Sequence, residues 1–490
     1  MAIAYSDKPF KVRLAESEQD TFMQKAVAKA QDAQWTKRTA SRNELGHWEQ
    51  WRELGQQIRQ HVVRYLPDYL EEFADNAEKR GAHVYFARTD KEAAAYIREL
   101  AERKHVQHVV KSKSMVTTEI DLDQELLKIP GLSLLETDLA EFILQEDDWD
   151  EPTHIVFPTL HKNRDQIHEI FAKIGYKGDN DPQHMARFAR EYLRASFLKA
   201  DMGITGCNFA VADTGMVNLV TNEGNGDLTM AIPPTQVVVM GMERLVPSLK
   251  EAEVLDNMLA RSAVGQKLTS YCSFSSVAAT GESDGPTEYH IVIVDNGRMN
   301  ALGGPFEEVL QCIRCGACLN VCPVYRHIGG HGYGSIYPGP IGAVLSPVLR
   351  GYKQFGDLPF ASSLCGACTE TCPVKIPLHS LLIKHREVMM NELHMDTGLN
   401  KVTYKALGLA TGTPAIFHMG ISVDHSMTAL LSHHQEPTAQ NYFMGDGIMS
   451  KLPFILGGWT VIRDMPRPPR AKDNFRSWFK QHKQLQEAGR

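Results

Sequence analysis

The segment CIRCGACLNVCP (312–323) has the spacing C-x2-C-x2-C-x3-C-P, formed by Cys312, Cys315, Cys318 and Cys322. This spacing is typical of proteins with two iron–sulfur clusters, in which a loop wraps one cubane and the cysteine before the proline binds the other cluster. Thiolates suit iron because both partners are soft. Gly316, inside the motif, lets backbone amides approach the cluster sulfurs. The segment therefore predicts a site for two clusters.

A second segment, SSLCGACTETCP (362–373), matches the first when the two are aligned from the Cys-Pro end. It lacks the first cysteine, and Ser362 stands in that place. Under the crossed rule, each cluster takes the last cysteine of the other motif. The predicted ligands of cluster one are Cys312, Cys315, Cys318 and Cys372. The predicted ligands of cluster two are Cys322, Cys365 and Cys368.

The fourth ligand of cluster two stays open at this stage. Either the place is empty, as in a three-iron [3Fe–4S] cluster, or the Ser362 hydroxyl fills it, or a residue from elsewhere in the chain does so. The outside candidates are Cys207, Cys272, His327, His331 and His379. For each of these, a buried small side chain or a solvated loop histidine is the simpler interpretation.

Zinc and disulfide bonds explain the cysteines less well. A structural zinc site uses four ligands, usually as two CxxC pairs, and does not require two motifs that each end in Cys-Pro. Seven of the nine cysteines belong to the two motifs, and the N-terminal sequence lacks the zones of a secretory signal. In a reducing compartment, clustered cysteines are metal ligands more often than disulfides. We therefore expect a cytoplasmic protein.

The composition gives no sign of nucleic-acid binding or of a transmembrane span. The net charge is −7, so the chain has no overall basic character for nucleic acid. The most apolar late stretch, LPFILGGWTVI (452–462), has eleven residues. A bilayer span needs roughly 20 residues. The stretch therefore predicts a buried core segment, and contact with a membrane surface is left open.

Strands and helices alternate before the cysteines. The helix after the first predicted strand begins with Asp90 as its cap. Alternation of this kind indicates a largely parallel sheet with helices on both faces. The predicted strands are HVYFA (83–87), HVVKS (108–112), LSLLET (132–137) and HIVFP (154–158).

Changes in residue composition and pattern along the chain predict four parts. Residues 1–43 are polar and predict an N-terminal arm or an isolated helix. Residues 44–300 form the α/β region, which becomes rich in strands after Gly203. Residues 301–395 hold the two cysteine motifs, and residues 396–490 form a C-terminal extension.

The two motifs resemble those of the iron–sulfur subunits of L-lactate utilisation systems. The resemblance extends over CIRCGACLNVCPVYRHIGGHGYGSIYPGPIG (312–342) and LCGACTETCPVKIPLH (364–379). The stretch TGCNFAVADTGMVNLVTNEGNGDLTMAIPPTQVVVMGMERLVP (205–247) is similar to the core of the lactate-utilisation (LUD) domain, and KSKSMVTTEI (111–120) and LLETDLAEFILQ (134–145) fit that domain too. The resemblance covers essentially the whole chain, including the three-cysteine second motif.

The resemblance implies both a fold and a role. The implied fold is an α/β LUD domain, related to sugar-phosphate isomerases and CoA-transferases, then a helical ferredoxin-type domain and a family-specific extension. The implied role is electron relay through two [4Fe–4S] clusters while L-lactate is oxidised to pyruvate. The implied partners are a cysteine-rich subunit and a separate LUD-domain protein. Whether the chain is itself an enzyme stays open.

Two features of the α/β region are candidates for small-molecule binding. KSKS (111–114) follows a predicted strand and opens a helix, so Lys111 and Lys113 are candidate anion ligands, although a polar loop is the simpler interpretation. Glu223, in NEGNGD (222–227), is a candidate nucleophile by analogy with the transferases, although a glycine turn is simpler. We find no Gly-x-Gly-x-x-Gly fingerprint for a nicotinamide or flavin. The alternative function is therefore a LUD domain that itself binds or transforms a small acid or thioester, with the clusters as its redox partner.

Overall fold

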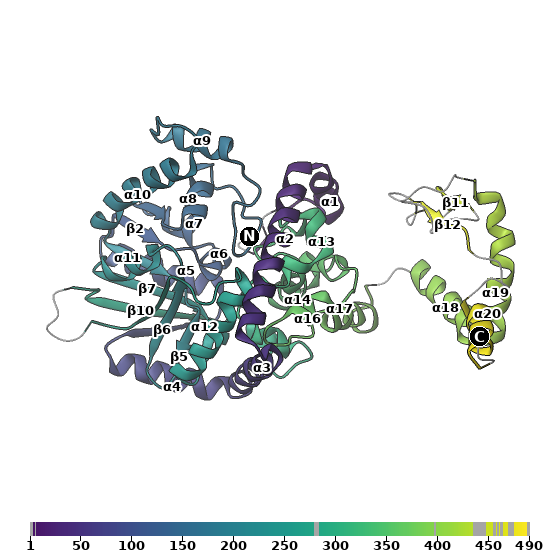
Figure 1. Cartoon of the computed structure of the whole chain (residues 1–490). Helices are drawn as coiled ribbons and strands as arrows, with labels where there is room; N and C mark the ends of the chain where they lie inside the picture. The colour runs from purple at the N-terminus through teal and green to yellow at the C-terminus, as the bar shows by residue number, and fades with distance from the viewer. Residues whose placement is uncertain are drawn as a thin grey trace. The chain divides into compact units, whose positions relative to one another are not determined.

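The chain forms two compact units, Met1–Leu393 and His394–Arg490 (Figure 1). The first unit contains both the sheets and the cysteine motifs. The structure is a computed structural model, and it describes residues 3–4, 6–278, 284–395, 398–434, 447–453, 457, 460, 464–468 and 475–487.

A six-stranded parallel sheet forms the core of the α/β region, in the order β1-β10-β7-β4-β2-β3. Figure 1 labels its strands β2, β7 and β10. Strands β4 and β7 are buried along their whole length, as expected for strands covered on both faces. Because the strands are parallel, their carboxyl ends meet at one edge, where ligands usually bind. The strands are β1 (His83–Ala87), β2 (His108–Lys111), β3 (Ser133–Glu136), β4 (Met202–Thr205), β7 (Thr235–Gly241) and β10 (Glu288–Val294).

Helices cover both faces of this sheet, as the alternation predicts. Val237 and Val239 of β7 share a core with the helix α5, whereas Val238 and Met240 share one with α4 on the other face. The helices of this region are α3 (Trp48–Arg64), α4 (Leu66–Lys79), α5 (Asp90–Arg103), α6 (Met115–Glu119), α7 (Leu122–Leu126), α8 (Leu139–Glu146), α9 (Arg164–Lys173), α10 (Pro182–Lys199), α11 (Asn225–Ala231) and α12 (Leu249–Ala263), with the short 3₁₀ helices η1 (Met242–Arg244) and η2 (Arg298–Asn300).

A second sheet of four strands has the order β8-β5-β6-β9. Strand β6 runs antiparallel to both of its neighbours, and β5 runs parallel to β8. This sheet accounts for the strand-rich texture predicted after Gly203. Its strands are β5 (Phe209–Val211), β6 (Met216–Thr221), β8 (Leu245–Val246) and β9 (Tyr271–Ser275).

Within 301–395, every regular element that the structure describes is helical. This region shares one apolar core with the α/β region, since Ile313 and Leu319 pack in the same cluster as Val211 and Met258. Its elements are η3 (Glu307–Gln311), η4 (Leu319–Val321), α13 (Pro323–Ile328), η5 (His331–Tyr333), α14 (Gly339–Arg350), α15 (Tyr352–Phe355), η6 (Leu358–Phe360), α16 (Ala367–Thr371), α17 (Leu378–Glu387) and the π-helix η7 (Val388–Glu392).

The N-terminal segment packs against the cysteine region instead of forming a free arm or isolated helix. It contains α1 (Phe10–Gln19) and α2 (Thr21–Leu45). Met23 and Val27 of α2 are buried, and the buried Gln31 amide donates to the carbonyl oxygens of Leu319 (2.8 Å) and Cys322 (3.1 Å). The buried side of α2 includes long polar side chains, and for this reason its sequence looks like that of a solvated helix.

Two local predictions in the α/β region are wrong. HIVFP (154–158) is a loop, because the amides of Val156 (2.9 Å) and Phe157 (3.2 Å) donate to Nδ1 of His154 instead of to a neighbouring strand. The cap of α5 is Thr89, whereas Asp90 is the first helical residue and pairs with Arg350 at 2.6 Å. The strands predicted at 83–87, 108–112 and 132–137 are confirmed to within one residue at either end.

The second unit contains α18 (Gly398–Gly412), α19 (Pro414–Met427), η8 (Thr428–Leu431), α20 (Phe475–Glu487) and the antiparallel pair β11 (Ile448–Met449) and β12 (Met465–Pro466). In the part of the chain that the structure describes, no single helix is long and apolar enough to cross a membrane. Lys401–Gly412 and Pro414–Leu431 reach that length only as a pair, which is bent by 103°. Most of the apolar stretch 452–462 lies outside the described residues.

Candidate metal centre and adjoining pocket

The two cysteine motifs are copies of one backbone structure. Arg314 (φ 59°) and Gly316 (φ 72°) adopt left-handed conformations in the first motif, and Leu364 (φ 54°) and Gly366 (φ 81°) do so at the aligned positions of the second. Each glycine carbonyl then accepts a 3.0 Å hydrogen bond from the amide three residues later. Glycine tolerates this conformation because it has no Cβ.

Ser362 takes the structural place of Cys312, and not only its place in the alignment. The amide of Arg314 donates to Sγ of Cys312 at 3.4 Å. The amide of Leu364 donates in the same way to Oγ of Ser362 at 3.1 Å. The Ser362 hydroxyl is therefore held in the position that a cysteine thiol holds in the first motif.

The first group of cysteines surrounds a small apolar cavity, and Cys312, Cys315, Cys318 and Cys372 line it. Burial, followed by the charges of Cys372 and Cys312, raises the pKa of Cys315 to about 12. Burial also raises the pKa of Cys372 to about 11, and Cys312 again contributes. Cys372 of the second motif thus lies among the cysteines of the first.

The second group contains the remaining three cysteines of the motifs. Burial is the largest cause that raises the pKa of Cys368 to about 11, and Cys322 and Cys365 also raise it. The pKa of Cys322 is also raised by burial, and Cys365 adds to the shift. Cys365 is exposed, whereas Cys322 and Cys368 are buried. The second group therefore reaches the surface of the unit.

The donor chemistry of both groups fits iron–sulfur clusters. All nine cysteines are free of disulfide bonds. Backbone amides point at the ligand sulfurs, as from Tyr325 to Cys322 (3.5 Å) and from Ile376 to Cys372 (3.4 Å), and such bonds tune cluster potentials. No group of three or more His, Cys, Asp or Glu in the described ranges has the arrangement of a site for a single metal ion.

The two cysteines outside the motifs lie in other surroundings. Cys272 donates from Sγ to Oδ2 of Asp256 at 2.9 Å. Cys207 packs beside the core that α4 shares with the six-stranded sheet. Burial raises the pKa of Cys207 to about 12. Both thiols are thus in contact with residues of the α/β region.

The candidate histidines also differ in position. His331 bonds through Nε2 to the carbonyl of Glu151 (2.8 Å), and His327 is exposed on α13. His379 bonds through Nδ1 to Oγ1 of Thr369 (2.8 Å), beside the second motif. Among all the outside candidates, His379 is therefore the one with a direct contact to that motif.

The two lysines of the KSKS loop have different roles. Lys111 is 1% exposed and pairs with Glu136 and, at 3.4 Å, with Asp123. Burial lowers its pKa, but these two carboxylates raise it more. Lys111 is therefore not available to an outside anion. Lys113 is half-buried, donates to the carbonyl of Ile155 (2.6 Å) and lines a pocket.

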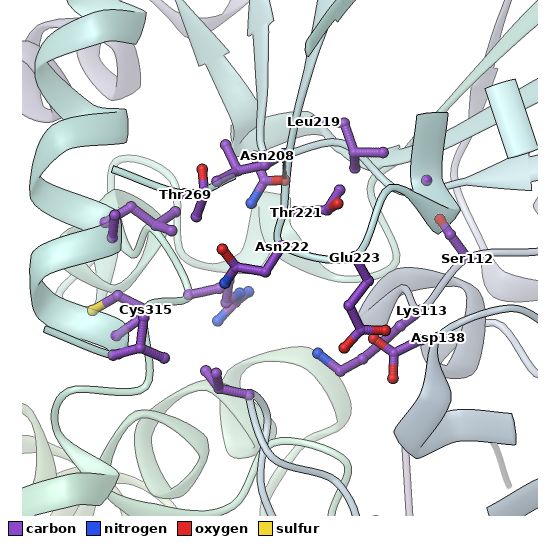
Figure 2. A pocket seen from close by; sticks show the side chains of 18 of the residues that line it. Ser112, Lys113, Asp138, Asn208, Leu219, Thr221, Asn222, Glu223, Thr269 and Cys315 are labelled. Carbon is purple, nitrogen blue, oxygen red and sulfur yellow. Dashed lines mark hydrogen bonds between the residues drawn. The ribbon is translucent and has the colours of Figure 1, made fainter. Parts of the chain in front are cut away.

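That pocket has a volume of about 340 Å³ and lies between the sheet edge and the first cysteine motif. Figure 2 shows Lys113, Asp138 and Glu223 gathered on one side of it and Cys315 on the other. Desolvation raises the pKa of Glu223, and the Asp138 carboxylate raises it further. Arg314 of the first motif lines the pocket as well.

Two family models match the first unit. The LUD domain matches residues 70–294, and the 4Fe-4S dicluster domain matches residues 308–376. "Lactate utilization protein B" of Bacillus pumilus (strain SAFR-032) is 51% identical over 481 residues, which are 98% of this chain and 98% of that protein. The chain belongs to this family. The protein of that name from Bacillus cereus (strain B4264) is 51% identical over 484 residues, 99% of each chain.

One solved structure is also similar to this member of the lactate utilization protein B family. It is a DUF162 family protein from Deinococcus radiodurans, which is 15% identical. The match covers 47% of this chain and 98% of that chain, with a TM-score of 0.27.

In this lactate utilization protein B family member, arginines surround the first cysteine group. Arg52 donates to the carbonyl of Cys372 (2.9 Å), and Arg38 donates to the carbonyl of Thr371 (2.5 Å). Burial lowers the pKa of Arg38 to about 10, so it stays charged near neutral pH. Positive charge next to a cluster favours the reduced, more negative form. The full set is Arg38, Arg52, Arg59, Arg244 and Arg314.

Proposed function

We propose that this member of the lactate utilization protein B family carries electrons through two [4Fe–4S] clusters while L-lactate is oxidised to pyruvate. A bound cluster of this type accepts and releases one electron at a time. The observation that carries the proposal is the position of Cys372 among the cysteines of the first motif, which suits crossed ligation. The name of its relatives supports the link to lactate. Its partners in this proposal are a cysteine-rich subunit and a separate LUD-domain protein.

The two clusters have different surroundings in this proposal. Cluster one is held by Cys312, Cys315, Cys318 and Cys372 and lies beside the five arginines. Cluster two is held by Cys322, Cys365, Cys368 and the Ser362 hydroxyl and reaches the surface at Cys365. Cluster one is therefore the more easily reduced, and cluster two is where electrons are exchanged with a partner protein.

A redox titration of the full chain tests the electron-carrier proposal. After anaerobic purification, electron paramagnetic resonance (EPR) is expected to detect two one-electron reductions, and cluster one is reduced at the higher potential. With a dye acceptor, the isolated chain is expected not to oxidise L-lactate, since a one-electron carrier takes no hydride. A preparation without iron and sulfide, or steady turnover of L-lactate by the chain alone, would contradict the proposal.

Replacing Ser362 by alanine is expected to convert cluster two to a three-iron form. The reason is that the hydroxyl holds the place of a ligand, next to the amide of Leu364. The oxidised variant should gain the EPR signal of a three-iron cluster, and its iron content should fall by one atom per chain. Ser362→Cys should retain the full iron content.

The neighbouring Ser363 provides the matched control, because it is exposed and precedes the same left-handed residue, Leu364. Ser363→Ala should leave the iron content and both EPR signals unchanged. Ser362 is not a ligand if Ser362→Ala keeps the iron content and the oxidised and reduced spectra of the unaltered chain.

A further inference from the structure

Helix α20 of the second unit, yellow in Figure 1, carries large apolar side chains that are exposed. Phe475, Trp478, Phe479 and Leu485 are each at least half exposed, and their spacing places them on one face of the helix. The ring of Phe475 contacts those of Trp478 and Phe479, with centroids 5.6 and 5.7 Å apart. The ring of Trp478 stacks on His482 at 4.9 Å. These side chains therefore form one continuous aromatic face.

Basic side chains flank the aromatic face of α20. Lys480 and Lys483 are exposed, and the helical spacing places both outside that face. Lys483 pairs with Glu487 at 3.8 Å, but both side chains are exposed, and such a pair is weak. Residues 394–490 include 11 Lys and Arg and 7 Asp and Glu, so the second unit has a net charge of +4 in a chain whose net charge is −7. The aromatic face therefore belongs to a positively charged unit.

A second apolar surface belongs to the same unit. It is a stripe of exposed side chains at helical spacing on α19, formed by Ile416, Met419, Val423 and Met427. On the opposite side of α19, His425 bonds through Nδ1 to the carbonyl of Pro468 at 2.8 Å. The stripe is therefore turned away from the contact between α19 and the segment after β12. Large exposed apolar patches of this kind mark sites of interaction with proteins or membranes.

We infer that the second unit docks on the surface of an anionic membrane through α20. A helix with Trp, Phe and Leu on one face and lysines beside it lies in the plane of a bilayer interface. Trp478 and the two phenylalanines enter the layer below the headgroups, and Lys480 and Lys483 reach the anionic headgroups. A bilayer also receives the stripe on α19, whereas a protein groove binds a single amphipathic helix. The charges of −7 for the chain and +4 for the second unit leave −11 on the first unit, so the same surface repels the first unit.

Sedimentation of the full, cluster-loaded chain with lipid vesicles tests the inference. The chain is expected to bind vesicles of equal parts phosphatidylglycerol and phosphatidylcholine, and to bind pure phosphatidylcholine vesicles much more weakly. Trp478→Ser is expected to weaken binding about tenfold, because one large apolar side chain no longer leaves water. Replacing both Lys480 and Lys483 by Gln is expected to weaken binding to the mixed vesicles about thirtyfold. Trp35→Ser is the matched control, since Trp35 of α2 is 52% exposed and Trp478 is 53% exposed.

Three results would overturn the inference. The first is that the unaltered chain does not bind the mixed vesicles, or binds both kinds of vesicle equally. The second is that Trp35→Ser weakens binding as much as Trp478→Ser does. The third is a dimer in vesicle-free solution that Trp478→Ser dissociates, since the aromatic face would then bind a second copy of the chain. The comparison of the two lipid compositions uses the unaltered chain alone, so it decides the question even if a variant fails to fold.

Discussion

Replacing Cys372 by alanine is expected to remove cluster one, although Cys372 belongs to the second motif. Its thiol lines the small apolar cavity together with the three cysteines of the first motif. A cubane that loses one of these four thiolates finds no other iron-binding side chain among the residues that line the cavity. Iron and sulfide contents should fall by about half. The EPR spectrum of the reduced variant should match that of Cys315→Ala.

The reciprocal variant is Cys322→Ala, which is expected to remove cluster two. Its reduced spectrum should match that of Cys368→Ala, because Cys322 and Cys365 both lie near enough to Cys368 for their charge to raise its pKa. Uncrossed ligation gives the opposite pairing, with Cys372→Ala matching Cys368→Ala, and that result would contradict the proposal. Cys272→Ala is the control, since that thiol bonds Asp256 in the α/β region, and it should retain both clusters.

The parts of the molecule that sequence predicts well depend on local patterns. The spacing of the cysteines is local, so the two motifs are visible without a structure. The strands at 83–87 and 108–112 are also local, because short runs of β-branched and aromatic residues between helices determine them. HIVFP has the same composition and misleads, since His154 takes the amides that a strand would need.

The pocket and the arginines could not be predicted, because they depend on contacts between distant parts of the chain. Ser112, Thr221 and Arg314 are far apart in sequence and meet only where the sheet edge faces the cysteine loop. Arg38 looks like a surface residue of a polar helix, yet it is buried against Thr371. The equivalence of Ser362 and Cys312 likewise rests on backbone hydrogen bonds, which an alignment does not contain.

Replacing Arg298 by methionine is expected to lower the free energy of unfolding by about 3–5 kcal/mol, the usual cost of leaving a buried charge without its partner. Arg298 is fully buried and makes two parallel bonds to Glu119, at 2.8 and 2.9 Å. It also donates to Glu243 at 2.6 Å. Glu119 in turn accepts from the hydroxyl of Tyr337 (2.5 Å), so the network joins the α/β region to the helical region.

The loss of stability should depend on pH in a direction that identifies its cause. Burial alone would raise the pKa of Glu119, but the charge of Arg298 holds it below the ordinary value. In the unaltered chain, this pair therefore adds stability above the unfolded pKa of about 4.3 and loses it as the pH falls further. Without Arg298, burial raises the pKa of Glu119, and proton uptake favours the folded state. The difference in free energy of unfolding between the unaltered chain and the variant should then become smaller as the pH falls from 8 to 6.

Urea unfolding followed by circular dichroism at both pH values measures this effect under anaerobic conditions. Arg187→Met is the matched control, because Arg187 pairs with Glu191 on the surface with both side chains more than half exposed. Exposed pairs contribute about 0–1 kcal/mol, so this variant should unfold almost as the unaltered chain does. An Arg298→Met deficit below about 1 kcal/mol, or an equal deficit at both pH values, would show that Glu119 does not depend on this arginine for its charge.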